Sequence, residues 1–253
     1  MGKTISVINQ KGGVGKSTTA QALAAGLSLK GFKVLILDLD PQMNTSLTFK
    51  ADPEQDSMAD VLGKKYKTVN AIQKCDYCDI ICGNKALASA DVVLNDTGKE
   101  YRIQEALEQV KDSYDYIILD TPPALGVLTV NALTASDTVI IPAQADIYSI
   151  SGIADLTDSI NAIIKYCNRS LKIEGILLTR YNPRLQFNRE LSNYANQMAE
   201  NLKTKLYTTT IREAIAIRKA QVMQKSIFDF DANSNVAKDY MAFVEEFLEK
   251  ETK

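Results

Sequence analysis

The stretch Asn9-Gln-Lys-Gly-Gly-Val-Gly-Lys-Ser-Thr-Thr19 decides how the rest of this 253-residue chain is interpreted. An apolar run, Ile5–Ile8, precedes it, and an Ala- and Leu-rich segment that predicts a helix, Ala20–Leu29, follows it. A glycine-rich loop between a strand and a helix is a typical phosphate-binding arrangement, because its backbone N–H groups and the helix N-terminus both face an anion. Side chains would obstruct that concavity, which accounts for the glycines.

The polar residues that end this loop have the chemistry that a nucleotide requires. Lys16 is long enough to reach β- and γ-phosphates, and the Ser17 hydroxyl is a suitable ligand for Mg²⁺. The loop departs from the general pattern, because Gln10 stands where a glycine is usual and Lys11 adds a second lysine at the front edge. A simple glycine turn between strand and helix is the alternative. The predicted nucleotide-binding residues are Lys11, Gly12, Gly13, Val14, Gly15, Lys16, Ser17 and Thr18.

Lys11–Ser17 resembles the deviant Walker A loop of the ParA/MinD group of P-loop ATPases. The resemblance continues in the same order at Asp38–Gln42, Ile118–Pro123 and Leu177–Pro183, and so extends over nearly the whole chain. It implies an ATPase that uses ATP and Mg²⁺ and that forms a homodimer with ATP. In that family the early lysine crosses the dimer interface to touch the partner's nucleotide, and this catalytic role is implied for Lys11.

Length and composition favour one α/β domain over residues 1–253 with an ordinary hydrophobic core. The start of the sequence has no signal-peptide pattern, and no apolar stretch approaches the roughly 20 residues of a membrane helix. The chain contains no histidine, which excludes Ser/His and Cys/His catalytic pairs. Its four cysteines favour reduced thiols in a cytoplasm, although a metal or redox role for Cys75, Cys78 and Cys82 remains an alternative.

Continuous apolar runs alternate with helix-period segments along the chain. Because strands buried on both faces have this pattern, we predict a doubly wound, mostly parallel sheet flanked by helices on both faces, as in a P-loop NTPase. The predicted strands are residues 4–9, 33–38, 79–82, 115–119, 138–142 and 173–179. The predicted helices are residues 16–30, 100–112, 125–135, 150–167, 186–203 and 234–249.

Three aspartates follow predicted strands and are candidates for metal and water chemistry. Carboxylates at strand tips can hold Mg²⁺ or its waters, so we expect Ser17, Asp38 and Asp120 to form the metal site. Helix capping is the alternative for Asp120, because Thr-Pro-Pro follows it. By the family resemblance, Asp40 orients the attacking water, so the expected catalytic residues are Lys11, Lys16 and Asp40.

Later segments supply candidates for adenine and DNA binding. By resemblance, Arg180, Asn182, Thr210 and Ile211 lie near the base, where the Arg180 guanidinium can stack on a purine. Net charge is −2, but residues 160–228 hold twelve Lys and Arg against four Asp and Glu. Distributed positive charge of this kind suits a phosphate backbone more than base readout, although an ordinary solvated surface is the alternative. The expected DNA contacts are Arg189, Arg212, Arg218 and Lys219.

The resemblance predicts an ATPase that segregates plasmid or chromosomal DNA. An ATP-bound sandwich dimer would bind double-stranded DNA non-specifically, and a ParB-like or ribbon-helix-helix adaptor would stimulate hydrolysis. Because the glycine loop starts near residue 10, we expect no DNA-reading extension before it. The alternatives are a MinD-like positioning ATPase, disfavoured by the acidic end of the chain, an iron–sulfur reductase, a dethiobiotin-synthetase-type enzyme and a regulatory ATPase without DNA. The expected location is cytoplasmic, on the nucleoid, with no membrane partner.

Overall fold

In the computed structural model, which describes residues 2–251, the strands form one sheet in the order β3-β4-β2-β5-β1-β6-β7. Neighbouring strands run parallel, except that β3 pairs antiparallel with β4. The strands are β1 (Lys3–Val7), β2 (Val34–Asp38), β3 (Gln73–Lys74), β4 (Asp79–Ile81), β5 (Tyr116–Asp120), β6 (Thr138–Gln144) and β7 (Lys172–Thr179). The predicted doubly wound α/β fold is confirmed.

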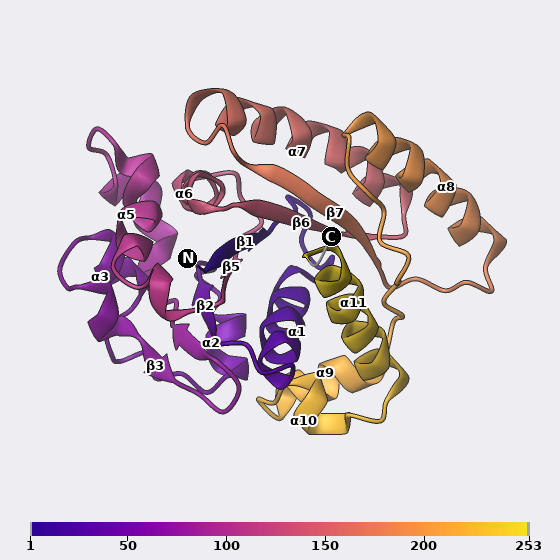
Figure 1. The fold of residues 1–253 in the computed structure, drawn as a ribbon, viewed down its shortest axis with the longest axis horizontal. Helices are drawn as coiled ribbons and strands as arrows, with labels where there is room; N and C mark the ends of the chain where they lie inside the picture. Colours follow the sequence, from indigo (N-terminus) through magenta and orange to yellow (C-terminus); the bar gives the residue numbers. More distant parts are fainter. Residues whose placement is uncertain (1, 252–253) are drawn as a thin grey trace.

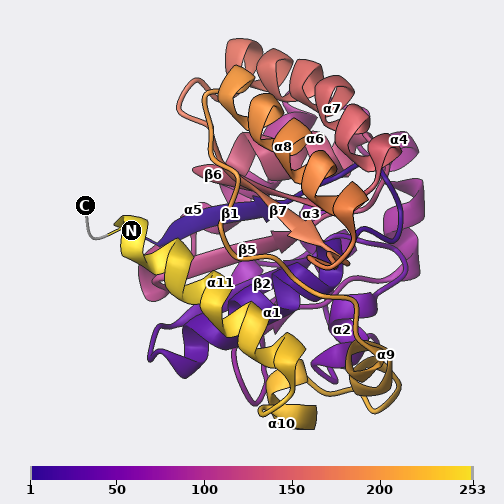
Figure 2. The ribbon, with the colours of Figure 1, turned by 90° about the vertical axis from the view of Figure 1, so that its right-hand side faces the viewer.

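Helices cover both faces of this sheet (Figures 1 and 2). The α-helices are α1 (Lys16–Leu29), α2 (Asn44–Thr48), α3 (Met58–Leu62), α4 (Ala90–Val93), α5 (Arg102–Glu108), α6 (Val127–Ala135), α7 (Ile147–Tyr166), α8 (Gln186–Asn201), α9 (Ile215–Val222), α10 (Ile227–Asp231) and α11 (Asn235–Glu251). One face packs against α1 and α9 to α11, and the other packs against α3 to α8.

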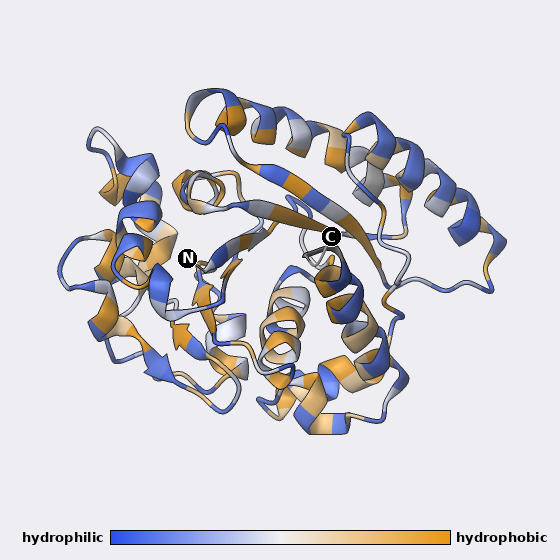
Figure 3. Cartoon of the chain, viewed as in Figure 1, coloured by the Kyte–Doolittle hydropathy of each residue, from blue (hydrophilic) through white to orange (hydrophobic). Residues whose placement is uncertain are grey.

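The side chains of β2 show why its sequence is apolar at every position. Val34 and Ile36 belong to the core beneath α1 and α11, whereas Leu35 and Leu37 belong to the core beneath α3, α5 and α6. Successive side chains of a strand point to opposite faces, so a strand covered on both sides needs a continuous apolar run. Figure 3 shows hydrophobic residues along the central strands and hydrophilic residues over much of α7 and α8.

The first and last long helices pack unusually closely. A Cβ atom placed on Gly26 of α1 would lie 2.7 Å from Cγ2 of the buried Val244 of α11. Glycine therefore lets α11 approach the helix that carries the phosphate loop more closely than alanine would permit.

Among the described residues, neither edge of the sheet presents a long strand with free backbone groups. β3 is two residues long and runs antiparallel to its neighbour, and β7 is bridged along its free edge by Leu206, with the Tyr207 N–H donating to the Ile176 carbonyl. Backbone groups on a free edge strand are otherwise available for pairing with another chain.

Most predicted elements lie within a few residues of their observed positions. The differences are in short elements: β3 and the helices α2, α3, α4, α9 and α10 were not predicted from the sequence. The segment predicted as a helix over 100–112 is divided into α5 and short 3-10 turns on either side. None of the helices in the described chain combines the length and the apolarity that crossing a lipid bilayer requires.

Candidate functional site

The glycine loop joins β1 to α1 at the carboxyl edge of the sheet. Gly13 and Gly15 have φ angles of 77° and 90°, a left-handed conformation that glycine adopts without a Cβ penalty. The Asn9 side chain fixes the start of the loop, because its Nδ2 donates to the Pro142 carbonyl and its Oδ1 accepts from the Lys11 N–H. The loop therefore has the backbone conformation that directs N–H groups toward an anion.

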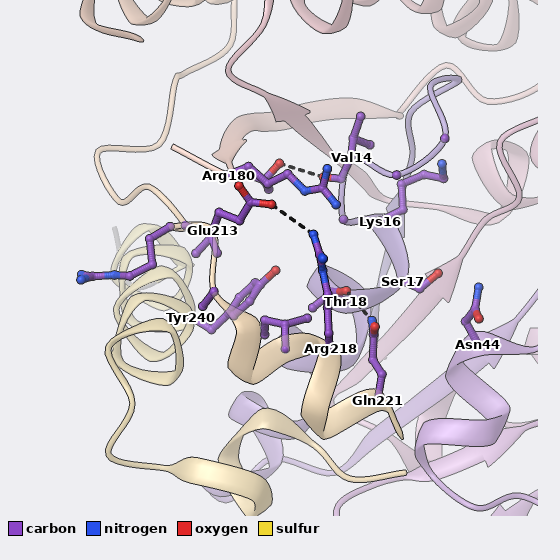
Figure 4. Close-up of a pocket in the computed structure, with 18 of the residues that line it drawn as sticks. Val14, Lys16, Ser17, Thr18, Asn44, Arg180, Glu213, Arg218, Gln221 and Tyr240 are labelled. Atoms are coloured by element: carbon purple, nitrogen blue, oxygen red, sulfur yellow. Dashed lines mark hydrogen bonds and ion pairs between the residues drawn. The ribbon is translucent and has the colours of Figure 1, made fainter. Parts of the chain in front are cut away.

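A cavity of about 510 Å³ opens in front of this loop. Its walls combine the residues predicted for phosphate with residues from distant segments, and Figure 4 shows Arg180, Glu213 and Arg218 around a space beside the loop that carries Val14 and Lys16. The lining includes Gly12, Gly13, Val14, Gly15, Lys16, Ser17, Thr18, Asp40, Asn44, Thr179, Arg180, Ile211, Glu213, Arg218, Gln221 and Tyr240.

Lys16 is the buried cation of this cavity. Its Nζ donates to the Lys11 carbonyl at 3.2 Å, and the residue is 7% exposed. Burial lowers the Lys16 pKa below its ordinary value, whereas the nearby Asp120 and Asp40 carboxylates oppose that shift. A phosphate group at the loop would stabilise the charged form further.

Asp38 and Asp120 end the neighbouring strands β2 and β5, where they are opposite each other in the parallel register. Both carboxyl groups are fully buried, and burial raises both pKa values above their ordinary range. Asp120 Oδ2 accepts the Thr45 hydroxyl at 2.6 Å, whereas Oδ1 has no hydrogen-bond partner among the described residues. A buried carboxylate oxygen without a donor, close to Ser17, fits a hard cation.

Asp38 differs from Asp120 because its oxygens are already engaged. Oδ2 accepts both the backbone N–H and the hydroxyl of Ser46, and Oδ1 accepts the Asp40 N–H. These bonds connect the tip of β2 to α2. Thus Asp120 and Ser17 are better placed to hold Mg²⁺ or its waters, and Asp38 holds the segment beside them.

Asp40 and Asn44 lie on the cavity wall near Lys16, on the segment that leads into α2. The Asp40 Oδ1 accepts the Gln42 N–H at 2.9 Å, which leaves its other oxygen for a ligand or water. Met43, between them, has a left-handed φ of 57° and is the N-cap residue that precedes α2. A tight turn thus brings both polar side chains to the phosphate end of the cavity.

Lys11 does not line this cavity. Its Nζ lies 2.8 Å from both carboxylate oxygens of Asp146, the residue that caps the N-terminus of α7 by accepting the Ser149 N–H. The Lys11 and Asp146 side chains are 37% and 27% exposed. The front-edge lysine is therefore held by its own chain, away from the phosphates that its own loop would bind.

The residues predicted for adenine divide between two adjoining cavities. Arg180 and Ile211 line the phosphate cavity, whereas Asn182 and Thr210 line a second cavity of about 820 Å³. The two cavities share Arg180, Arg212, Glu213, Ala214 and Arg218. The Thr179 hydroxyl donates to the Val14 carbonyl at 2.8 Å, which joins the end of β7 to the glycine loop.

The predicted DNA contacts do not form one cluster of free cations. Arg189 is exposed on α8 and donates to the Pro183 carbonyl, and Lys219 is exposed on α9. Arg212 donates from Nε and Nη2 to the Asp239 carboxylate at 2.6 and 2.8 Å. Both Arg212 and Arg218 line the phosphate cavity.

Sequence reasoning missed Asp146, Gln221 and Tyr240. Asp146 and Gln221 are more than a hundred residues from their partners Lys11 and Thr18, and Tyr240 lines the cavity from α11. No local motif marks them. The four cysteines are free thiols, burial raises the pKa of Cys75 and Cys82 to about 11, and the described residues contain no group of three His, Cys, Asp or Glu arranged for a metal.

The site combines a loop with two glycines in the left-handed conformation, a buried lysine and two buried carboxyl groups at the ends of neighbouring strands. This combination is the nucleotide site of a P-loop ATPase. The model of the family described as "AAA domain" matches residues 2–173. The sporulation initiation inhibitor protein Soj of Bacillus subtilis is 39% identical, with 97% of this chain and 98% of Soj covered. The chromosome partitioning protein ParA of Myxococcus xanthus is 33% identical, with 100% and 90% covered. This chain belongs to the ParA/Soj family of ATPases.

Solved structures agree with this assignment. A plasmid partition protein of Borrelia burgdorferi bound to AMPPNP has a TM-score of 0.81 and 27% identity, with 98% of this chain and 99% of that chain covered. Cobyrinic acid a,c-diamide synthase of Mycobacterium smegmatis with an ATP analogue and magnesium has a TM-score of 0.86 and 28% identity, with 100% and 97% covered. The protein is an ATPase, and its cofactors are ATP and Mg²⁺.

Proposed function

We propose that this chain, as a single domain over residues 1–253, is the ATPase of a DNA-segregation system. ATP and Mg²⁺ favour a sandwich homodimer, the dimer binds double-stranded DNA without sequence preference, and a ParB-like or ribbon-helix-helix adaptor stimulates hydrolysis. The proposed location is the nucleoid in the cytoplasm, with no membrane partner. Relatives named for chromosome and plasmid partitioning support this proposal.

The position of Lys11 is the observation that carries the proposal. Within its own chain the lysine is paired with Asp146 and is absent from the wall of the nucleotide cavity. A front-edge lysine in this position is accessible to a second subunit that approaches the same face. In the proposed dimer, Lys11 leaves Asp146 and stabilises negative charge on the partner's nucleotide in the transition state, as an arginine finger does in other P-loop enzymes.

Asp40 completes the proposed chemistry. Phosphoryl transfer to water depends mainly on an in-line water and on neutralised oxygen charge. Asp40 Oδ2 has no hydrogen-bond partner among the described residues and would accept from that water, and Lys16 neutralises the phosphates. In the proposed metal site Ser17 and Asp120 hold the ion or its waters, and Asp38 contributes from beside them through its contacts with Ser46 and Asp40. When bound, Mg²⁺ supplies charge stabilisation at the phosphate oxygens.

The proposed DNA contacts are weak individually and require two subunits. Arg189 and Lys219 are exposed, and Arg212 would exchange Asp239 for a DNA phosphate. A dimer doubles the number of such contacts, and linked contacts increase apparent affinity strongly. ATP-dependent dimerisation would thereby control DNA binding.

The decisive experiment measures molecular mass and DNA binding of an Asp40→Ala variant. With ATP and Mg²⁺ this variant is expected to accumulate as a dimer, since it binds nucleotide without completing turnover. Lys16→Ala is the matched control and is expected to stay monomeric because it loses phosphate binding. A monomer at saturating ATP in the Asp40→Ala variant would contradict the proposed dimer.

DNA binding is then measured with random duplex over a range of salt concentrations. The Asp40→Ala dimer is expected to bind with a steep loss of affinity as salt rises, and only when ATP is present. A dimer that forms normally but shows no duplex affinity at low salt would retain the ATPase assignment and exclude the segregation function.

A further inference from the structure

One face of α9 lies against the nucleotide cavity. Ile217, Arg218 and Gln221 line that cavity, whereas Lys219 and Val222 are exposed outside it. Residues three or four positions apart are neighbours on a helix surface, so Gln221 lies on the same side as Ile217 and Arg218, which is the inner surface of α9. Arg218 thus projects from the inner surface, although the sequence placed it among the DNA contacts.

A hydrogen bond joins α9 to the first turn of α1, directly after the glycine loop. Gln221 Nε2 donates to the Thr18 hydroxyl at 3.3 Å, and Figure 4 shows Gln221 and Arg218 reaching from α9 toward the loop and α1. Thr18 follows Ser17 at the N-terminus of α1, which is the region that receives phosphate. The helix that carries Arg218 is therefore positioned directly at the phosphate-binding element.

The contact that Arg218 makes within the chain is weak. Its Nη2 lies 3.4 Å from Glu213 Oε1, and the two side chains are 71% and 61% exposed. Ion pairs at that exposure contribute little, and this one is not bidentate. The same cavity also holds the positive groups of Lys16 and Arg180. A polyanion inside the cavity is consequently a stronger partner for the Arg218 guanidinium than Glu213 is.

We propose that Arg218 binds the nucleotide, at the α-phosphate next to the ribose. Among the lining residues, Lys16, Ser17 and Asp40 are the ones expected at the terminal phosphates, and Arg180 and Ile211 are the ones expected at the base. We place Arg218 between these two groups, because Gln221 of the same helix donates to Thr18 beside Ser17, and the Arg218 guanidinium donates to Glu213, which is close in sequence to Ile211. The inference rests on ATP binding at this cavity and assigns to Arg218 a nucleotide contact in place of a DNA contact.

The test measures the affinity of Arg218→Gln for ADP and for ATP, each with Mg²⁺, by calorimetry or a fluorescent nucleotide. An α-phosphate is common to both ligands, so both affinities are expected to fall roughly tenfold. Arg218→Lys keeps the charge but loses the planar fork, and is expected to recover part of that loss. ADP lacks the γ-phosphate, which separates this measurement from ATP-dependent dimerisation.

Lys238→Gln is the matched control. It removes one exposed positive charge from α11, a helix that borders the cavity through Tyr240, without altering a residue of the cavity wall. Its nucleotide affinities are expected to equal those of the unmodified protein. Equal losses in both variants would indicate a general charge effect and would overturn the assignment.

Two other outcomes would also overturn it. Unchanged ADP and ATP affinity in Arg218→Gln, with weaker duplex binding at saturating ATP, would return Arg218 to the DNA surface. A loss for ATP alone would move the contact from the α-phosphate to the γ-phosphate. The nucleotide affinities alone decide the assignment of Arg218, because a protein that fails to bind DNA still reports them; failure of the proposed DNA binding is therefore distinguishable from failure of this inference.

Discussion

Replacing Asp146 by Asn is expected to make ATP-dependent dimerisation tighter. Lys11 Nζ lies 2.8 Å from both Asp146 oxygens in the single chain, and in the proposed dimer this lysine moves to the partner's nucleotide. The Lys11–Asp146 ion pair must therefore break in each subunit before each Lys11 can reach the nucleotide of the other subunit. Asn removes the negative charge that opposes the exchange.

The size of the effect follows from the exposure of the pair. A partly exposed ion pair contributes about 0.5–1 kcal/mol, so two of them oppose dimerisation by about 1–2 kcal/mol. That difference corresponds to a dimer dissociation constant about 5- to 30-fold lower in Asp146→Asn. The substitution keeps the cap of α7, because Asn and Asp are equally good at accepting a backbone N–H such as that of Ser149.

Analytical ultracentrifugation over a concentration series, with ATP and Mg²⁺ in the Asp40→Ala background, measures this constant. Without nucleotide, Asp146→Asn is expected to remain monomeric. In Lys11→Ala, where the pair is already absent, the further change Asp146→Asn is expected to add nothing. An unchanged or weaker dimer in Asp146→Asn would refute the view that Asp146 restrains Lys11.

Three further predictions concern the metal site, the core and the DNA surface. Burial raises the Asp120 pKa in the folded state, so the carboxyl group costs stability at pH values where it is ionised in the unfolded chain. Asp120→Asn is therefore expected to raise Tm at pH 8 without nucleotide. The gain is expected to disappear below about pH 4, where the unmodified carboxyl group is protonated in both the folded and the unfolded state. The Tm of Asp120→Asn is expected to respond less to added Mg²⁺ and ATP, and a Tm below that of the unmodified protein at pH 8 would contradict the reasoning. Gly26→Ala is expected to lower the free energy of unfolding, measured by chemical denaturation, by about 1–3 kcal/mol, because the new Cβ would lie 2.7 Å from Val244. The double variant Gly26→Ala/Val244→Ala is expected to recover part of that loss. An unchanged free energy of unfolding in the single variant would show that α11 shifts freely. Arg189→Gln is expected to weaken duplex binding and to reduce the salt slope by about 1 while ATP affinity is unchanged, and an unaltered slope would remove Arg189 from the DNA surface.

The central sheet was predictable because its strands carry an unambiguous signal. Buried strands such as Val34–Asp38 and Tyr116–Asp120 are apolar at successive positions, and polar residues mark their ends. The short helices were not predictable, because five residues such as Asn44–Thr48 span little more than one turn and display no period. Their formation depends on tertiary bonds such as those from Ser46 to Asp38.

The phosphate-binding residues could likewise be predicted from the sequence, because one local motif contains most of them. The opposite wall was not, since Arg218 and Gln221 reach the glycine loop only through the folding of the last third of the chain. A basic residue on a short helix looks the same in sequence whether it faces solvent or a ligand. For the same reason Asp146, 135 positions from Lys11, had no detectable role before the fold was known.

The restricted borders of the β-sheet limit how copies of this protein can join. An antiparallel strand of two residues terminates one border, and the Leu206 segment occupies the backbone of the other, so neither offers a long row of unpaired amides for strand addition. Filaments or larger oligomers would have to form through side-chain surfaces, whose polar contacts salt can weaken. Strand-swapped polymers, which resist such weakening, are disfavoured by this architecture.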